Sequence, residues 1–298
     1  MVDITHKSYS LRRAVVEATV SVSLPSTIEA IKQNKVPKGN IFEFSRAAGL
    51  LAAKKTYEVI PDCHPLPVEQ ASIQHEITGQ SIRILVEIST VYKTGVEVEA
   101  MHAASITALT MYDMLKPIDP KVEITGIRLL EKTGGKGDFK ASYPENLRIA
   151  LVTVSDKVLT GALDKPGEVI AGKLKKLNLH HIQRLTVGEN KADIEKACKD
   201  FIEQGFELIL LTGGSGLQLA DVTPDVVQSL LEREVPGIME AVRDYGRQRR
   251  PQALLGRGVA GFVGETLLIT LPGSPYGAEE SMDAIFPTIL HVFRSKKS

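Results

Sequence analysis

The stretch from Lys93 to Lys116 constrains the fold of the first half more than any other part of the sequence. It opens on a Thr94-Gly95 turn and continues through a long run of small and apolar residues that lacks Gly and Pro until Pro117. Because such a run favours a helix and proline ends one, the pattern predicts a single long helix. A long helix separates the groups at its two ends, so it limits what one chain can bring together.

Charged side chains stand near both ends of this predicted helix. Glu97 and Glu99 lie near its start, and Asp113 and Lys116 lie three positions apart near its end, on one face. That pair is either a solvated ion pair or an acid/base pair, and the second role requires burial that lowers the lysine pKa toward neutrality. Since a helix rises about 1.5 Å per residue, Glu99 and Asp113 lie roughly 20 Å apart. If both serve one small substrate, two copies of the chain build the site.

Composition excludes several classes of protein. A length of 298 residues suggests about two domains, and a formal net charge of zero argues against bulk binding of nucleic acid or an anionic membrane. No apolar run approaches the ~20 residues needed to cross a bilayer. The two cysteines, Cys63 and Cys198, have no CxxC spacing, which favours a reducing cytoplasm over a disulfide scaffold.

The first half reads as helices on one antiparallel sheet. Alternating, β-branched segments predict strands at 16–23, 70–77, 81–91 and 121–132, with further helices at 25–33 and 41–58. We therefore expect an α+β domain of the ferredoxin-like type. Lys38 stands in a basic turn before a helix N-terminus, as an anion ligand or a solvated lysine. His64 stands in a proline-rich loop, in a structural role or poised for proton transfer or phosphate contact.

The second half, beginning at Leu147, has a different pattern of predicted strands and helices. Strands at 148–155, 181–187, 207–212 and 265–271 alternate with helices at 167–178 and 191–204, and further helices follow Pro224, Arg233 and Pro275. This alternation predicts a three-layer α/β domain with a mostly parallel sheet. The glycine- and lysine-rich residues 133–146 place the domain boundary between 1–140 and 147–298.

Two segments stand where strands of the second half end. Asp156 follows one strand, and the sequence TGGSG at 212–216 follows another, with Asp221 and Asp225 just beyond. Ligands of such folds bind at the carboxyl ends of the strands, and glycines let backbone N–H groups approach a phosphate closely. Asp221 is placed to hold Mg²⁺ bridging phosphates. The motif lacks the GK[ST] of a Walker loop, so a plain tight turn is the alternative.

Several motifs in fixed order give the first half a family resemblance. PKG at 37–39, CHPLP at 63–67, KTGVEVEA at 93–100 and LTMYDMLK at 109–116 resemble the cyclic pyranopterin monophosphate synthases. That resemblance covers residues 1–140. It implies conversion of a cyclised GTP derivative to a pyranopterin with a cyclic phosphate, with release of pyrophosphate, no cofactor, and a hexamer whose sites lie between subunits.

The resemblance assigns roles to residues of this sequence. It implies catalytic roles for Asp113, Lys116, Lys38 and His64. It implies substrate contacts, with the phosphates held by lysines, for Asp62, Cys63, His64, Glu97, Val98, Glu99, Lys54 and Lys55. The chain departs from the pattern at Asp62, where the family has leucine, and at Asn40, where it has aspartate.

The second half resembles the molybdopterin adenylyltransferases, which transfer AMP from Mg-ATP to a pterin phosphate. The matching signatures are VSD at 154–156, TGGSG…DVTPD at 212–225, REVPG at 233–237 and LPGSP at 271–275. The resemblance implies that Asp221 is catalytic and binds the metal. It places the pterin and nucleotide at Asp156, Gly213, Gly214, Ser215, Gly216, Asp225, Pro272, Gly273 and Ser274. Departures from the family stand at Glu189, Gly256 and Tyr276.

Together these patterns predict a bifunctional, cytoplasmic enzyme of molybdenum cofactor synthesis. It takes small pterin and nucleotide substrates, and it binds neither nucleic acid nor membrane. Both families contain threefold axes, so a hexamer satisfies both halves. The alternative is a second half that binds pterin without catalysis or serves as an oligomerisation module. A scaffold protein is a further alternative, which the short linker disfavours.

Overall fold

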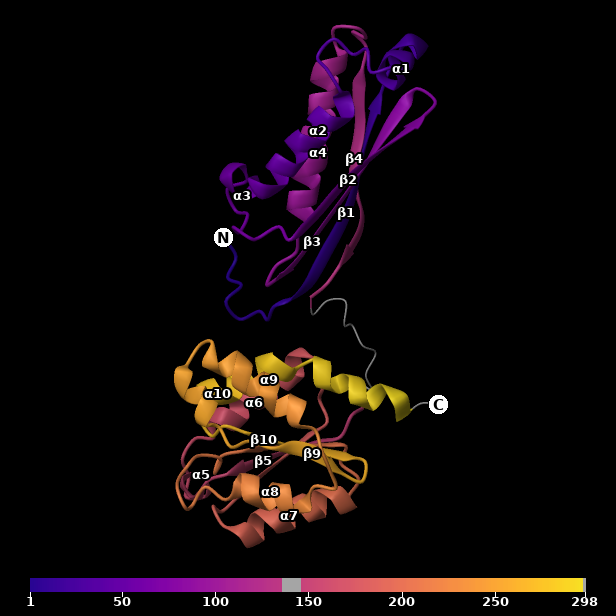
Figure 1. The fold of residues 1–298 in the computed structure, drawn as a ribbon. Helices are drawn as coiled ribbons and strands as arrows, with labels where there is room; N and C mark the ends of the chain where they lie inside the picture. The colour runs from indigo at the N-terminus through magenta and orange to yellow at the C-terminus, as the bar shows by residue number, and fades with distance from the viewer. Residues whose placement is uncertain (136–145, 297–298) are drawn as a thin grey trace. The chain divides into compact units, whose positions relative to one another are not determined.

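The computed structural model describes residues 1–135 and 146–296, and the chain divides into two compact units, Met1–Asp138 and Phe139–Ser298 (Figure 1). Most of the predicted boundary at 133–146 lies outside the described residues, as does Lys136 of the predicted linker. Each unit has a hydrophobic core of its own. No helix within the described ranges is both long and apolar enough to cross a membrane.

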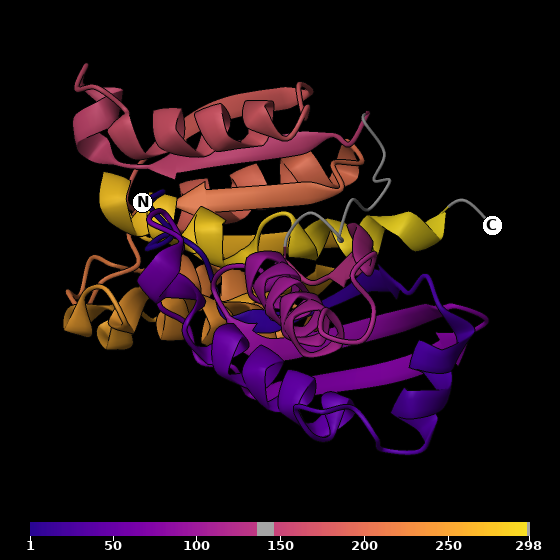
Figure 2. The same ribbon diagram turned by 90° about the horizontal axis from the view of Figure 1, so that it is seen from above.

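The first unit is built on a four-stranded antiparallel sheet. Its strands run in the order β2 (Gln70–Thr78), β3 (Ser81–Tyr92), β1 (Ser10–Ser21) and β4 (Glu123–Thr133). The helices are α1 (Pro25–Lys32), α2 (Ile41–Lys54), α3 (Thr56–Val59) and α4 (Glu97–Leu115). Figure 2 shows α2 and α4 side by side. The antiparallel sheet predicted for this half is confirmed.

Small side chains bring α4 close to the sheet and to α2. Ala100, Ala103, Ala104 and Ala108 of α4 are fully buried. Against them pack alternate residues of β1 and β3, which are buried because successive strand residues face opposite sides of a sheet. Gly49 of α2 lies so close that a Cβ there would collide with Thr107 of α4. The close packing fixes α4, and with it the groups at both of its ends.

Two boundaries of the first unit differ from the predictions. The helix predicted at 41–58 ends at Lys54, and a short α3 follows it after Lys55. Thr56 caps that break by donating to the carbonyls of Ala52 and Ala53. β1 begins at Ser10 rather than at residue 16, because Arg12 and Arg13 keep pairing with β3 although their side chains are polar.

The second unit has a six-stranded sheet in the order β6-β5-β7-β10-β9-β8. Four strands are parallel, namely β5 (Ile149–Val154), β6 (Ile182–Val187), β7 (Leu208–Thr212) and β10 (Thr266–Leu271). β9 (Ala260–Val263) and β8 (Arg233–Glu234) add an antiparallel edge. The mostly parallel sheet is confirmed, whereas the helix predicted from Arg233 begins only at Pro236, since Arg233 and Glu234 pair with β9.

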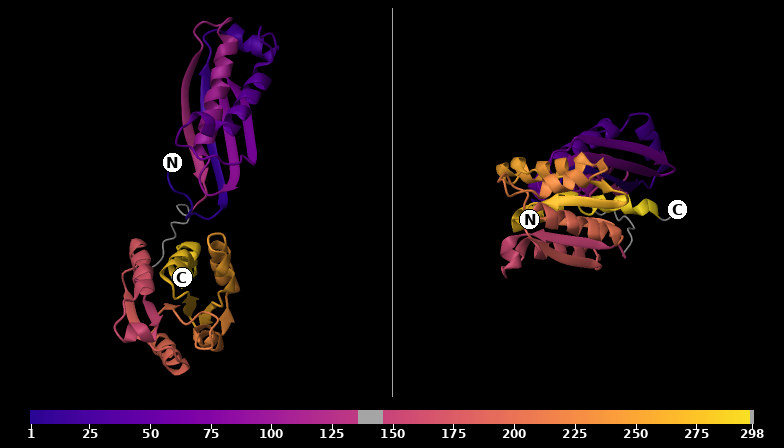
Figure 3. Two further views of the ribbon diagram at one scale, coloured as in Figure 1. Left: turned by 90° about the vertical axis from the view of Figure 1, so that its left-hand side faces the viewer. Right: turned by 90° about the horizontal axis from the view of Figure 1, so that it is seen from below.

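Helices cover both faces of this sheet. One layer holds α6 (Lys165–Lys176), α9 (Pro236–Arg247) and α10 (Pro275–Ile285), and the other holds α7 (Lys191–Glu203) and α8 (Thr223–Leu230) (Figures 1 and 3). α10 lies between α6 and α9. Short helical turns are α5 (Asp156–Leu159), η1 (Pro251–Leu255) and η2 (Thr288–Lys296). The central strands are buried on both faces, which explains their continuous apolar sequences.

Candidate functional site

The C-terminal end of α4 carries a cluster of three charges. Lys38 Nζ donates to Asp113 Oδ2 at 2.6 Å, and Lys116 Nζ lies 2.9 Å from Asp113 Oδ1. Lys38 is presented by the turn that leads into α2, where Asn40 caps the helix by accepting from the N–H groups of Phe42 and Glu43. The substitution of Asn for Asp at position 40 therefore keeps the cap.

This cluster is open to solvent in the single chain. The Asp113 side chain is 51% exposed, and hydrogen bonds from Lys116 and then Lys38 lower its pKa to about 2. The same contact with Asp113 raises the pKa of Lys116. In one chain the pair is therefore the solvated ion pair of the two alternatives, because no element of the described residues covers it.

The N-terminal end of α4 carries a buried carboxylate. Glu99 is 3% exposed and accepts a hydrogen bond from Cys63 Sγ at 3.1 Å. Burial raises the pKa of Glu99, and burial followed by the hydrogen bond to Glu99 raises the pKa of Cys63 to about 12. Cys63 is therefore a neutral thiol at neutral pH. Glu97 turns toward the sheet edge instead, where it lies 3.1 Å from Lys132 Nζ.

The proline-rich loop packs against the first residues of the chain. His64 Nε2 lies 2.8 Å from the carbonyl oxygen of Val2, and Asp62 Oδ1 lies 2.6 Å from the amino group of Met1. The hydrogen bond from that amino group lowers the pKa of Asp62. The negative charge at position 62 is thus paired.

The remaining predicted substrate residues lie on the surface. Val98 is 43% exposed, Lys54 is exposed at the end of α2, and Lys55 pairs with Glu58 at 3.2 Å. The structure thus brings Lys38 and Lys116 into ion pairs with Asp113, and it brings Cys63 into a hydrogen bond with Glu99. The Asp113 cluster and the Cys63–Glu99 pair are not in contact within one chain, because Glu99 and Asp113 lie about 21 Å apart along the same helix.

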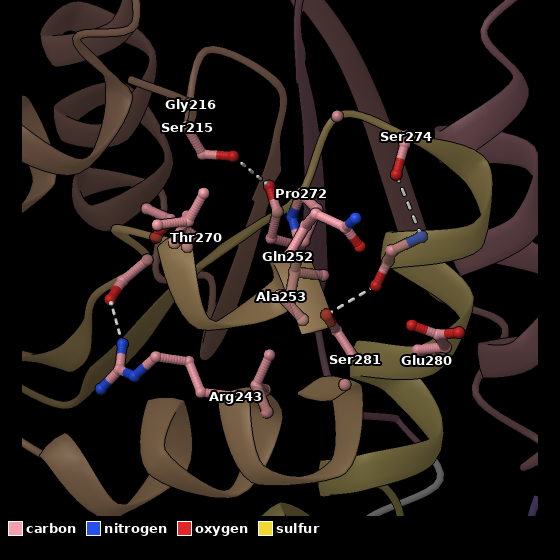
Figure 4. Close-up of a pocket in the computed structure, with 18 of the residues that line it drawn as sticks. Ser215, Gly216, Arg243, Gln252, Ala253, Thr270, Pro272, Ser274, Glu280 and Ser281 are labelled. Atoms are coloured by element: carbon pink, nitrogen blue, oxygen red, sulfur yellow. Dashed lines mark hydrogen bonds between the residues drawn. The ribbon is translucent and has the colours of Figure 1, made fainter. Parts of the chain in front are cut away.

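The second unit has a cavity of about 720 Å³ at the carboxyl ends of β7 and β10 (Figure 4). Its walls come from the two loops that follow these strands and from α9, η1 and α10. Seven of the predicted residues line it, namely Gly214, Ser215, Gly216, Asp221, Pro272, Gly273 and Ser274. Gly213, Asp156 and Asp225 do not line this cavity.

The two loops pack tightly because of glycine. Gly213 has φ +102° and Gly214 has φ +57°, both in the region that favours glycine, and a Cβ on Gly213 would collide with the carbonyl of Val154. A Cβ on Gly273 would lie 2.9 Å from Gly213 Cα. Backbone groups of the loops therefore reach the cavity without side chains in between.

Asp225 and Asp156 tie the neighbouring loops together. Arg257 donates to Asp225 Oδ2 at 2.7 Å, which lowers the pKa of Asp225, and also to the carbonyls of Gly216 and Asp221. Asp156 Oδ1 accepts from the backbone N–H of Glu189 at 3.1 Å. These carboxylates hold the loops in place rather than forming the wall of the cavity.

Sequence reasoning missed the far wall of the cavity. It is lined by Arg243, Arg250, Gln252, Glu280 and Ser281, which come from α9, the turn after it, η1 and α10. These residues belong to amphipathic helices and turns that carry no motif. The basic sequence at 247–250 was the one signal for Arg250, because it predicts a cluster of cations after the helix.

Asp221 fits a magnesium site that is completed by a nucleotide. Its Oδ2 accepts the N–H of Gln218 at 2.8 Å, which fixes the side chain. Within residues 1–135 and 146–296 no group of three or more His, Cys, Asp or Glu could hold a metal alone. Mg²⁺ commonly takes one or two carboxylates and completes its shell with phosphate oxygens and water, so a single aspartate is compatible with it.

Comparison with known proteins places the chain in a class, that of two-domain proteins of molybdenum cofactor biosynthesis. Residues 1–135 match the MoaC family, and residues 150–291 match the model described as a probable molybdopterin binding domain. The chain is 35% identical over 295 residues to the molybdenum cofactor biosynthesis bifunctional protein of Chlorobaculum tepidum, covering 98% of this chain and 93% of that protein. The chain belongs to the family of molybdenum cofactor biosynthesis bifunctional proteins.

Each half also has relatives of its own. The chain is 44% identical over 149 residues to the cyclic pyranopterin monophosphate synthase of Nostoc, covering 48% of this chain and 87% of that enzyme. The solved molybdopterin biosynthesis enzyme MoaB from Thermus thermophilus is 37% identical, with a TM-score of 0.46, and covers 50% of this chain and 98% of that chain.

Proposed function

We propose that the first unit converts a cyclised GTP derivative to cyclic pyranopterin monophosphate with release of pyrophosphate. The observation that carries the proposal is the cluster in which two lysines flank Asp113 within 2.9 Å. An anionic substrate that enters this cluster exchanges the carboxylate for phosphate oxygens as partner of the ammonium groups. Lys54 and Lys55 are further cations for the triphosphate.

The two ends of α4 carry carboxyl groups whose pKa values are shifted in opposite directions. The pKa of Asp113 is lowered to about 2, which keeps it an anion that orients the two lysines, and burial raises the pKa of Glu99 in the direction that suits proton transfer nearer neutrality. Pairs of carboxyl groups pushed apart in this way suit acid and base roles in one reaction. Opening and closing the rings requires both roles near neutrality. His64, beside Cys63, is a second proton carrier.

We propose that this site is shared between copies of the chain. One α4 cannot bring Glu99 to Asp113, so a neighbouring protomer supplies the second end. The outer surface of α2 and α4 offers exposed apolar side chains for such contacts, including Phe44, Leu51 and Leu109. A hexamer satisfies this requirement and the threefold symmetry expected of both halves. Sedimentation of a monomer at micromolar concentration would contradict it.

We propose that the second unit adenylylates molybdopterin with Mg-ATP. Mg²⁺, when bound at Asp221, neutralises the phosphate charge of the nucleotide. The chain itself positions the reactants, with the backbone N–H groups of Gly214 to Gly216 approaching phosphate and Asp221 fixed by Gln218. The second candidate, a pterin binder without catalysis, is favoured by the departures at Glu189, Gly256 and Tyr276.

Two substitutions separate the activities. Full-length chain carrying Asp113→Asn is expected to lose pyranopterin formation and keep adenylylation, and chain carrying Asp221→Asn is expected to show the converse. Each is assayed in vitro and by complementation of strains that lack one activity. If wild-type chain with Mg-ATP and molybdopterin gives no adenylylated product by mass spectrometry, the binder is the correct function.

We propose two further assignments. The order β1-α-β2-β3-α4-β4 with sheet order β2-β3-β1-β4 supports a ferredoxin-like fold for the first unit. The two unpaired cysteines support a cytoplasmic location.

A further inference from the structure

A carboxylate from α10 lines the cavity of the second unit without a close partner. Glu280 is one of the cavity's wall residues, and its side chain is 20% exposed (Figure 4). Its one ion pair among the described residues is with Arg250, whose Nε lies 3.5 Å from Oε1. That is longer than the 2.7–2.9 Å typical of charge-assisted hydrogen bonds. A mostly buried carboxylate with so weak a partner has unused capacity to accept hydrogen bonds.

Arg250 brings a guanidinium near this carboxylate. Its guanidinium lies 4.4 Å from the ring centroid of Tyr276, and its side chain is 52% exposed at the cavity wall. A guanidinium offers parallel N–H donors in one plane, which a carboxylate accepts side by side. The amino-pyrimidinone edge of a pterin offers the same pair, a ring N–H beside an exocyclic NH₂. The arginine and the pterin edge are therefore competing donors for one acceptor.

The cavity walls suit a flat ring. Gly246, Gly258 and Gly277 line the cavity, and a Cβ on Gly246 would lie 2.8 Å from Ala253 Cβ, and one on Gly277 2.7 Å from Pro272 Cβ. Met239 and Val242 supply apolar surface from α9. A cavity lined by apolar groups and a few placed polar ones is the usual form of a site for a small heterocycle. The loop after β7 lines the cavity with Gly214, Ser215 and Gly216, and Figure 4 shows Ser215 and Gly216 on the other side of the cavity from Glu280.

We infer that Glu280 recognises the amino-pyrimidinone edge of the pterin and that Arg250 is its weak partner until the ligand enters. The inference rests on the proposed binding of a pterin by the second unit. It sets the direction of the ligand, with the ring toward α9 and α10 and the phosphate toward Gly214 to Gly216. It also makes Glu280 the residue that distinguishes an amino-pyrimidinone from its dioxo analogue.

The test compares two small ligands on the full-length chain. Pterin carries the 2-amino group, and lumazine carries an oxygen there, which would face the carboxylate with lone pairs. In fluorescence titrations wild-type chain is expected to bind pterin at least about tenfold more tightly than lumazine, since a lost hydrogen bond to a charged group is worth that much. Glu280→Gln is expected to reduce this ratio to less than about threefold.

Two further variants distinguish recognition of the pterin by Glu280 from a purely structural role of the ion pair between Arg250 and Glu280. Glu279→Gln is the matched control, because Glu279 is 51% exposed, pairs with Lys173 at 3.3 Å and does not line the cavity. It is expected to keep the wild-type ratio. Arg250→Gln is expected to keep the ratio and to bind pterin at least as tightly as wild type, since the competing donor is gone.

The outcomes that overturn the inference differ from those that overturn the proposed function. Equal binding of pterin and lumazine by wild-type chain overturns the role of Glu280 and leaves the cavity as a pterin site. A wild-type ratio in Glu280→Gln has the same meaning. Binding of neither ligand by wild-type chain removes the proposed pterin site and the inference together. The wild-type comparison decides the question even if Glu280→Gln does not fold.

Discussion

Lys38 Nζ lies 2.6 Å from Asp113 Oδ2, although the two residues are 75 positions apart in the sequence. The turn before α2 meets the end of α4 because Gly49 and the alanines of α4 let the two helices approach closely. The ion pair is exposed, so its contribution to stability is small. The ion pair instead serves to hold two cations and a carboxylate close together at the end of α4.

Asp113→Asn tests the role of this cluster. We expect the rate of pyranopterin formation to fall by about 10²–10⁴, the usual scale for acid–base catalysis, because the carboxylate that positions both lysines is lost. The melting temperature should stay close to wild type, since exposed ion pairs contribute little. The matched control is Glu195→Gln, which breaks the exposed pair with Lys199 at 2.7 Å in the second unit and should leave the rate unchanged. A full rate in Asp113→Asn would contradict the proposed site.

Glu99→Gln tests the buried carboxylate through pH. The folded chain raises the pKa of Glu99, so it binds this proton more tightly than the unfolded chain does. The resulting stability is present at low pH and is lost as pH rises through the raised pKa. Glutamine does not titrate, so the Glu99→Gln variant does not lose this stability as pH rises. The melting temperature of the variant minus that of wild type should therefore be larger at pH 8 than at pH 4. The activity of the variant should be lower than that of wild type.

The control for that experiment is Glu97→Gln, two positions earlier in α4. Glu97 pairs with Lys132 at 3.1 Å, so replacing it does not remove an unfavourable buried charge. Its melting temperature relative to wild type should not increase with pH. A difference between Glu99→Gln and wild type that stays constant from pH 4 to pH 8 would show that Glu99 titrates like a solvated glutamate.

Alkylation should distinguish the folded chain from the unfolded one. Burial raises the pKa of both Cys63 and Cys198 to about 12, so both are thiols rather than thiolates at pH 8. We expect iodoacetamide to modify both slowly in the native protein and rapidly in denaturant, as followed by mass spectrometry. Cys63 should react first, because it is only partly buried. Rapid native modification of Cys63 would contradict its hydrogen bond to Glu99.

Gly273→Ala tests the contact between the two loops of the cavity. A Cβ there would lie 2.9 Å from Gly213 Cα, so the loops must move apart, and we expect a loss of about 1–3 kcal/mol together with weaker pterin binding. Gly172→Ala is the control. It lies inside α6 with no atom within 4 Å of the added Cβ, and it should stabilise the fold by about 0.5–1 kcal/mol. Denaturant titrations measure both.

Local sequence rules predict the elements better than they predict the contacts between them. Spacing and the proline stop predict the long helix, and α4 confirms it from Glu97 to Leu115. The i,i+3 spacing also predicts the pair of Asp113 with Lys116. Spacing leaves open whether the pair is solvated or buried, because burial depends on what covers a residue, and spacing within one helix contains no information about that.

The cavity shows the same limit. Glycine and proline motifs locate the two loops that follow β7 and β10. Glu280 reaches the same cavity from α10, whose sequence signals only an apolar face and a polar face, and Arg250 reaches it from the turn between α9 and η1. Which polar residue faces the cavity depends on how α9 and α10 pack, and that packing is a property of the tertiary fold.

The length of α4 has a genetic consequence. If the two ends of this helix act in different catalytic centres, a chain defective at Asp113 and a chain defective at Glu99 carry complementary lesions. Co-assembled in one cell, the two mutant polypeptides would form some intact centres where neither polypeptide alone forms any. Two alleles, each inactive by itself, would then support growth together.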